Sequence, residues 1–262
     1  MNRHDFLGAP VRGAIEDPVE ARRAIADAKA ILLDWDGCAA IADRPQAAAV
    51  ALMSARPDAF AIVSNNTCHA RGFFSERLRA SGVRLEPERV ILAGVETLLR
   101  ARQLATGRTL LLGSARMEDA ARRMGLNLVT DDPDLVVLLR DTRFSYAKLA
   151  QAVNSVRGGA RLLVGNPDRT HPSAEGRVMP ETGALMAAVL ACTEPLAVDP
   201  EIVGKPHPTL FLRACEALGV RPEEAVMIGD NPETDVAGAA PLGLGCILVD
   251  GPGGLSLDDL VA

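Results

Sequence analysis

The feature that most constrains the fold is an apolar run that stops abruptly at polar residues, and it occurs three times. Ile31-Leu32-Leu33 precedes Asp34-Trp35-Asp36-Gly37, Phe60-Ala61-Ile62-Val63 precedes Ser64-Asn65-Asn66-Thr67, and Ala225-Val226-Met227-Ile228 precedes Gly229-Asp230. Short continuous apolar runs are typical of strands buried on both faces, as in parallel sheets. Ligands of α/β proteins bind at the carboxyl ends of such strands. We therefore predict an α/β fold with a doubly wound, mostly parallel sheet and a site at these strand ends.

Two carboxylates, Asp34 and Asp36, lie two positions apart at the end of the first run. Carboxylates held close together repel unless a cation offsets their charge, so the pair indicates a bound cation. The alternative is a strand-ending turn in which Asp36 and Gly37 supply only turn chemistry. The hydroxyl and amide groups after the second run suit an anion, because backbone amides at a helix start point outward. An ordinary helix cap is the alternative there.

Composition narrows the class of protein. The chain of 262 residues is long enough for one large or two modest domains. Its formal net charge of -6, without a basic stripe, argues against a nucleic-acid partner. No apolar run approaches the ~20 residues of a membrane span, and the longest, 184–192, is expected to be a buried helix. The N-terminal stretch lacks the apolar core of a signal peptide. The five cysteines are scattered without paired spacing, which favours reduced thiols in a cytoplasmic protein.

Helices and strands are expected to alternate along the whole chain. The expected helices cover 17–29, 46–55, 70–81, 95–105, 118–124, 146–156, 184–193, 209–218 and 255–260, and the expected strands 31–33, 60–63, 90–92, 110–112, 135–139, 161–164, 225–228 and 246–249. A new alternation begins at Thr109 without a low-complexity linker, which indicates a domain inserted into a loop. We place a Rossmann-like core at 1–105 and 201–262, and an inserted α/β cap at 106–200.

One connection in the predicted cap is rich in turn formers and carries many functional groups. It runs from Asn166 to Arg177 and includes Asp168 and His171. Such loops often serve binding. For His171 a solvated loop histidine is the competing interpretation, and a metal role is disfavoured because no ligand-spaced partner accompanies it. Further on, Lys205 lies between glycine and proline, so a turn is expected to present its side chain.

Four motifs resemble, in order and spacing, those of the haloacid dehalogenase superfamily. They are Asp34-x-Asp36-Gly37, Ser64-Asn65-Asn66, Gly204-Lys205-Pro206 and Gly229-Asp230-Asn231-x-x-x-Asp235. The insertion, with Asn166-Pro167-Asp168 and Gly183-Ala184-Leu185, looks like the p-nitrophenylphosphatase or NagD-like branch. The resemblance covers nearly the whole chain from about Lys29. Trp35, Cys38 and a long N-terminal extension depart from the usual pattern, but no catalytic group is missing; we expect Cys38 to pack rather than act as a nucleophile.

The resemblance implies a Mg²⁺-dependent phosphatase that hydrolyses small-molecule phosphate monoesters through an aspartyl-phosphate intermediate. Asp34 would be the nucleophile and Asp36 the general acid and base. Ser64 would hold phosphoryl oxygens, and Lys205 would bridge Asp34 and the phosphate. The implied metal residues are Asp34, Asp36 (through its backbone carbonyl), Asp230 and Asp235, the last through water or an indirect contact. The implied substrate residues are Ser64, Asn65, Asn66, Asp168, His171 and Lys205.

Other functions stay open at this point. A phosphomutase on the same scaffold and a non-catalytic sensor of a phosphorylated ligand are the alternatives, whereas dehalogenation is disfavoured because Asp36 is present to protonate an alkoxide. The loop at 166–177 resembles those of phosphoglycolate and pyridoxal phosphate phosphatases in His171-Pro172 and Gly176-Arg177. Sugar phosphates and nucleotides also remain candidate substrates. The resemblance further implies a homodimer formed through the cap.

Overall fold

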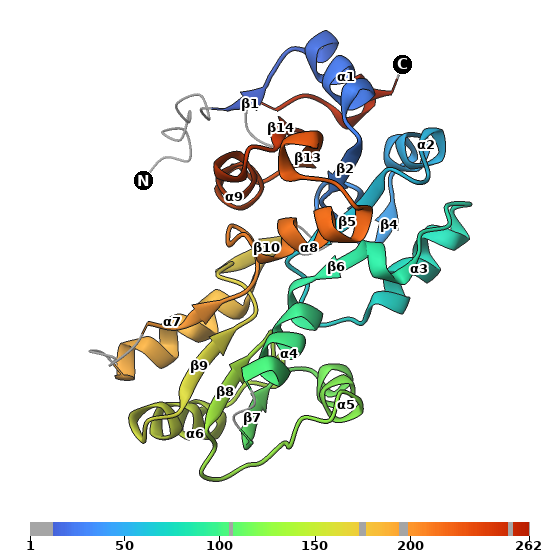
Figure 1. Cartoon of the computed structure of the whole chain (residues 1–262). Coiled ribbons are helices and arrows are strands. Elements are labelled where there is room, and N and C mark those ends of the chain that lie inside the picture. Colours follow the sequence, from blue (N-terminus) through green and yellow to red (C-terminus); the bar gives the residue numbers. More distant parts are fainter. Residues whose placement is uncertain (1–12, 105–106, 173–176, 194–198, 251–253, 262) are drawn as a thin grey trace. The chain divides into compact units, whose positions relative to one another are not determined.

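The structure is a computed structural model that describes residues 13–104, 107–172, 177–193, 199–250 and 254–261 (Figure 1). The N-terminal extension up to residue 12 and the loop positions 173–176 lie outside the described residues. The chain divides into two compact units. The first contains the described residues up to Ser64, Phe74–Ile91 and those from Phe211 onward, and the second contains Asn65–Phe73 and Leu92–Leu210. The predicted cap at 106–200 falls within the range of the second unit, and its insertion remains a prediction.

The larger sheet has the strand order β1-β14-β13-β2-β5-β6. The pairs β1–β14, β14–β13, β13–β2 and β2–β5 are all parallel. These strands are β1 (Ala14–Ile15), β2 (Ala30–Leu33), β5 (Phe60–Ser64), β6 (Val90–Leu92), β13 (Ala225–Gly229) and β14 (Gly245–Leu248). Every residue of β2 and β5 is buried, as expected for continuous apolar runs in a parallel sheet. The predicted α/β class with a mostly parallel sheet is confirmed.

Helices follow the strands of this sheet. They are α1 (Pro18–Asp27), α2 (Ala47–Ala55) and α9 (Ala237–Ala239), with α3 (Arg71–Ala80) and α8 (Thr209–Leu218) crossing the unit boundaries. Helix α1 begins as its sequence predicts, because Asp17 Oδ1 accepts hydrogen bonds from the backbone N–H groups of Val19 and Glu20 at 2.9 and 2.8 Å. Single turns lie at η1 (Pro87–Arg89), η2 (Pro222–Glu224), η3 (Pro232–Val236), η4 (Ala240–Leu242) and η5 (Leu257–Leu260). The helix expected at 255–260 is thus only the short turn η5.

The second unit has its own parallel sheet, with the order β12-β9-β8-β7. Its strands are β7 (Thr109–Leu112), β8 (Leu135–Leu138), β9 (Arg161–Val164) and β12 (Glu201–Ile202), and its helices are α4 (Ala93–Leu104), α5 (Ala115–Arg123), α6 (Tyr146–Arg157) and α7 (Thr182–Thr193). Alternate residues Val136 and Leu138 of β8 pack with Ala152 and Val156 of α6 and with Val189 of α7. The second α/β alternation therefore has a core of its own.

Two expectations for the second unit are corrected. The apolar stretch at 184–192 was expected to be a buried helix, but Ala187, Ala191 and Cys192 of α7 are exposed. Helix α7 is apolar on every side because it consists largely of small and aliphatic residues, but only one of its sides packs against the core of the second unit. The connection at 166–177 was expected to be a loop, but β10 (Thr170–Pro172) pairs antiparallel with β11 (Val178–Pro180). Within the described residues, no helix has the length and apolar character needed to cross a membrane.

Candidate active site

The acidic residues after β2 and β13 meet at one edge of the larger sheet. Asp34 directly follows β2 and Asp230 directly follows β13, its parallel neighbour. The Asp34 N–H donates to the Ile228 carbonyl at 2.9 Å, so the hydrogen bonding between β2 and β13 continues as far as Asp34. Asp235, on the π-helical turn η3, joins them, and one carboxylate oxygen from each of Asp34, Asp230 and Asp235 lies within 4.8 Å of the others.

Two glycines allow these carboxylates to approach the backbone. A Cβ at Gly37, where φ is +90°, would lie 2.3 Å from Asp230 Oδ2, and a Cβ at Gly229 would lie 2.2 Å from Asp235 Oδ2. Both distances are too short for any side chain, so glycine is required at each position. The Asn231 N–H also donates to Asp235 Oδ2 at 3.1 Å, which fixes that carboxylate. The two glycines therefore leave the space that the Asp230 and Asp235 carboxylates occupy.

This carboxylate cluster fits a divalent metal ion. Asp34 is 6% exposed and Asp235 1% exposed, so water can screen their mutual repulsion only weakly. Carboxylate oxygens are hard ligands of the kind that Mg²⁺ prefers. The three clustered carboxylates do not include that of Asp36, whose contribution through its backbone carbonyl stays a prediction.

Asp36 and Ser64 form a second pair of polar groups at the same sheet edge. Ser64 ends β5, the parallel neighbour of β2 on the side away from β13, and its Oγ donates to Asp36 Oδ2 at 3.4 Å. Asp34 is buried whereas Asp36 is exposed, so two acids two residues apart have different environments. After Asp36 the chain forms the hairpin of β3 (Ala40–Ile41) and β4 (Arg44–Pro45), which leads into α2. A buried and an exposed carboxylate side by side suit a nucleophile and a proton carrier, respectively.

Cys38 packs beneath these residues. Its side chain is fully buried and its thiol lies 3.8 Å from the Ile228 carbonyl oxygen. In the described part of the chain all five cysteines are free of disulfide bonds. Burial raises the pKa of the Cys68, Cys215 and Cys246 thiols to about 11, which keeps them protonated at neutral pH.

The second unit organises the remaining predicted site residues around Asn65. Its Oδ1 accepts from the Lys205 N–H at 2.7 Å, while its Nδ2 donates to the Lys205 carbonyl at 3.0 Å and to Asp168 Oδ2 at 2.9 Å. Asn166 Nδ2 donates to the Asn65 carbonyl at 2.6 Å. A bond from the His207 N–H to the Gly204 carbonyl closes the predicted turn around Lys205, which is 2% exposed. One amide side chain thus joins Lys205 and Asp168, which are far apart in sequence.

Asn66 has a structural contact in addition to its predicted role. Its Oδ1 accepts hydrogen bonds from the N–H groups of Cys68 and His69, both at 3.0 Å. These bonds form the turn that leads into α3, as Asn side chains commonly do. Binding of substrate by Asn66 stays a prediction, and the helix-cap alternative for this segment accounts for the contacts of its side-chain oxygen.

His171 lies on strand β10 and contacts an acid that the sequence analysis overlooked. His171 Nδ1 and Arg140 Nη1 each lie 3.3 Å from Glu181 Oε1. Burial raises the pKa of Glu181, and burial followed by the nearby Arg140 charge lowers the pKa of His171. Arg140 follows the apolar strand β8 and Glu181 immediately precedes α7. A polar residue after an apolar run was the signal that identified Asp34, and it also marks Arg140.

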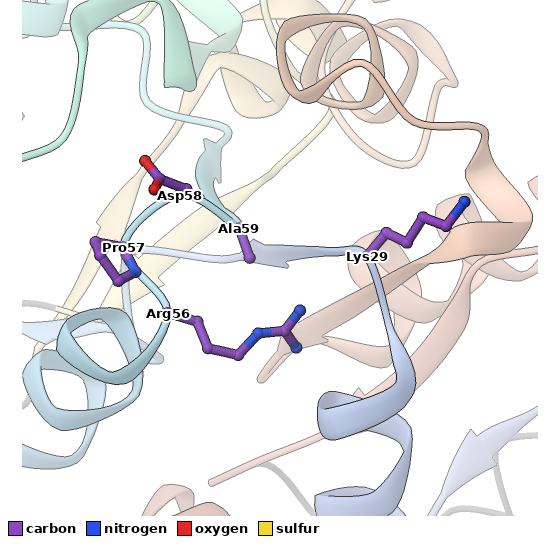
Figure 2. A pocket seen from close by; sticks show the side chains of 5 residues that line it. All are labelled: Lys29, Arg56, Pro57, Asp58 and Ala59. Carbon is purple, nitrogen blue, oxygen red and sulfur yellow. The ribbon is translucent and has the colours of Figure 1, made fainter.

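A surface pocket of about 370 Å³ lies elsewhere on the first unit (Figure 2). Lys29 precedes β2 and the residues Arg56 to Ala59 precede β5, so the pocket is at the amino ends of these strands, opposite the acids. Its cations already have partners, because Arg56 donates to the Ile25 and Ala28 carbonyls and Lys29 to Glu224. We assign this pocket no function.

Known proteins are similar to this chain in sequence. The haloacid dehalogenase-like hydrolase family matches residues 28–243. A dihydroxyacetone phosphatase of Corynebacterium glutamicum (strain R) is 33% identical over 192 residues, which are 72% of this chain and 68% of that protein. An acid sugar phosphatase of Staphylococcus aureus (strain USA300) is 31% identical over 189 residues, which are 71% of each chain.

Solved structures extend the comparison to the fold. A glycerol phosphate phosphatase from Mycobacterium tuberculosis in complex with magnesium has a TM-score of 0.77 and 28% identity, and the match covers 90% of this chain and 77% of that one. NagD from E. coli K-12 has a TM-score of 0.76 over 89% and 91% of the two chains, with 23% identity that supports the fold alone.

The chain therefore belongs to the haloacid dehalogenase-like hydrolases. Its predicted likeness to the p-nitrophenylphosphatase and NagD-like branch is confirmed, and so is its predicted class of enzyme, a phosphoric monoester hydrolase.

Proposed function

We propose that the chain is a Mg²⁺-dependent phosphatase that transfers the phosphoryl group of a small monoester to Asp34 and then to water. The observation that carries the proposal is the buried Asp34 in a cluster with Asp230 and Asp235, with an exposed acid two residues further along the chain. A family that includes dihydroxyacetone and sugar phosphatases supports it.

The first half-reaction uses both acids of the β2 end. A carboxylate oxygen of Asp34 attacks phosphorus while the bond from phosphorus to the ester oxygen breaks, leaving an aspartyl phosphate. Asp36 donates its proton to the leaving alkoxide. In the second half-reaction Asp36 takes a proton from water, and the resulting hydroxide displaces Asp34 from phosphorus to release inorganic phosphate. Its exposure suits Asp36 to exchange protons with both the alcohol and water.

The other predicted site residues bind and orient the phosphoryl group. We assign its oxygens to Ser64, Asn65, Asn66 and Lys205, and assign Asp34, Asp230, Asp235 and the Asp36 carbonyl to the metal. A bound Mg²⁺ would supply positive charge that offsets the repulsion between carboxylate and phosphate. The hydrogen bonds between Asn65 and the Lys205 backbone hold these two residues in a fixed geometry. The pairing of Ser64 with Asp36 likewise places a hydroxyl beside the proton carrier.

Phosphate release separates this function from the alternatives. With Mg²⁺ the protein should liberate inorganic phosphate from p-nitrophenyl phosphate and from a panel of glycolate, pyridoxal, sugar and nucleotide phosphates, and a chelator should stop the release. A phosphomutase would move the phosphoryl group between substrate positions without net release. A sensor would bind the monoesters, as calorimetry would show, and release nothing.

Two further properties belong to the same proposal. We propose that the enzyme works in the cytoplasm and forms a homodimer through the cap. Exposed Val178 and Met179 on the β10–β11 hairpin offer apolar surface for that contact. Light scattering should give twice the chain mass, and Val178→Lys should reduce it to the mass of one chain.

A further inference from the structure

A charge-balanced cluster in the second unit has no role in transfer of the phosphoryl group. It consists of Arg140 after β8, His171 on β10 and Glu181 before α7, with the two basic groups each 3.3 Å from the same Glu181 oxygen. Their side chains are 24%, 31% and 12% exposed, respectively. Residues from three separate elements thus converge on one partly accessible spot.

Buried hydroxyl groups hold this cluster to the segment that follows Ser64. Thr67 Oγ1 accepts from the Arg140 N–H at 3.1 Å and lies 3.3 Å from Thr182 Oγ1. The Thr182 N–H and hydroxyl in turn contact Glu181 Oε2 at 3.0 and 3.3 Å. Thr67 is two residues from Asn65, to which we assign a phosphoryl contact. Hydrogen bonds therefore connect the cluster to the segment to which we assign binding of the phosphoryl group, the part common to every substrate.

Two atoms of the cluster have unmet hydrogen-bonding capacity. Arg140 Nε and His171 Nδ1 are buried and have no hydrogen-bond partner among the residues that the structure describes. His171 Nδ1 is close to Glu181, but the geometry does not make a hydrogen bond. Buried polar atoms nearly always have partners, so these two nitrogens indicate a ligand or water that belongs in the cluster.

The charges of the cluster select the chemistry of that ligand. Glu181 offsets the charge of Arg140, and Asp168 adds a further negative charge close enough to affect Glu181. A carboxylate on the leaving group would meet two acids and a cation that is already paired. A hydroxyl group both donates and accepts, so a diol can donate to Glu181 and accept from Arg140 or His171.

We propose that Arg140, Glu181 and His171 are specificity residues that bind the hydroxyl groups of an uncharged, polyhydroxylated leaving group and exclude a leaving group with a carboxylate. The proposal rests on the proposed phosphatase function and names its substrate class as polyol or sugar phosphates. Like-charge contacts disfavour the wrong ligand in the same way in other selective sites.

The test compares kcat/KM for glycerol phosphate and 2-phosphoglycolate, with p-nitrophenyl phosphate as a general phosphatase substrate. Wild type should prefer glycerol phosphate by about tenfold or more. Glu181→Gln should lower kcat/KM for glycerol phosphate by about tenfold and raise it for 2-phosphoglycolate, because Arg140 becomes an unpaired cation. Arg140→Gln should lower kcat/KM for 2-phosphoglycolate below its wild-type value. The matched control Glu118→Gln, on helix α5 of the same unit, should leave the preference as in wild type.

A gain for the carboxylate substrate distinguishes recognition from simple damage to the fold, which would lower every rate. The proposal is overturned if wild type prefers 2-phosphoglycolate, or if Glu181→Gln lowers both rates in parallel. If Glu181→Gln does not fold, the wild-type preference and the direction of the Arg140→Gln change decide. Failure of the phosphatase function itself would look different, because wild type would then release no phosphate from any of the three substrates.

Discussion

The acidic residues of the two units have different neighbours. In the first unit, Asp34, Asp230 and Asp235 converge on one another. In the second unit, Glu181 is contacted by Arg140 and His171, and Asp168 accepts from Asn65. A bound cation would offset the repulsion among the three acids of the first arrangement, whereas the acids of the second lie beside basic or amide groups of the protein. This difference supports the proposals that the first site performs chemistry on a charged group and that the second recognises an uncharged one.

Asp34→Asn tests the first unit most directly and should have the largest effect. Loss of the carboxylate nucleophile leaves no path to the covalent intermediate, so phosphate release should fall by about a thousandfold or more. The protein should stay folded, because asparagine has nearly the same volume and reduces repulsion among the acids. Phosphate release and circular dichroism measure the two effects. Activity above a few per cent of wild type would place the nucleophile elsewhere.

Asp230→Ala should act through the metal rather than through the covalent step. Loss of one anionic ligand should raise the Mg²⁺ concentration needed for half-maximal activity by about tenfold or more. The shift in melting temperature on adding Mg²⁺, which does not depend on activity, should shrink as well. Glu233→Ala removes an exposed acid from the same segment and serves as the control. An unchanged Mg²⁺ titration would remove Asp230 from the metal site.

His171→Ala tests the second unit and should have a smaller, substrate-dependent effect. If a hydrogen bond to the leaving group is lost, kcat/KM for the preferred substrate should fall by about 1–3 kcal/mol in transition-state stabilisation. For p-nitrophenyl phosphate, which has no hydroxyl groups on its leaving group, kcat should hardly change. A substrate panel provides the measurement. A uniform loss over the panel would mean that His171 supports the chemistry or the fold instead.

The sequence predicted the first unit better than the second for a physical reason. Asp34 and Asp230 directly follow buried strands and Ser64 ends one, and a parallel sheet brings such positions to one edge independently of the loop conformations. The approach of Asp235 depends on the turn η3 and on Gly229, yet the motif spacing was enough to include it. Arg140 also follows an apolar strand, β8, but no such rule predicted its contact with Glu181. That contact depends on how the end of β8 and the start of α7 pack in three dimensions, which the spacing of residues in a single sequence does not reveal.

The same two strands that end in acids also begin at an ion pair, and this pair should have the smallest effect. Lys29 precedes β2 and Glu224 precedes β13, and Lys29 Nζ lies 2.6 Å from Glu224 Oε1 on the surface. The hydrogen bond from Lys29, followed by those from Arg221, lowers the pKa of Glu224 from 4.5 to about 2. Because the folded state then holds this proton less tightly than the unfolded chain, the contribution to stability is complete above pH 4.5 and disappears as the pH falls through 2.

Lys29→Met removes the main cause of that pKa shift. The variant should melt slightly below wild type at pH 6, since exposed pairs contribute little, and the difference should close as the pH falls toward 2. Arg122→Met, which loses a surface cation near Glu118 on α5, is the control for net charge. Melting temperatures of the three proteins across this pH range give the comparison. If the difference in melting temperature between Lys29→Met and wild type stays constant down to the lowest pH, Lys29 stabilises the start of β2 by packing. The ion pair would then not be what joins the amino ends of β2 and β13.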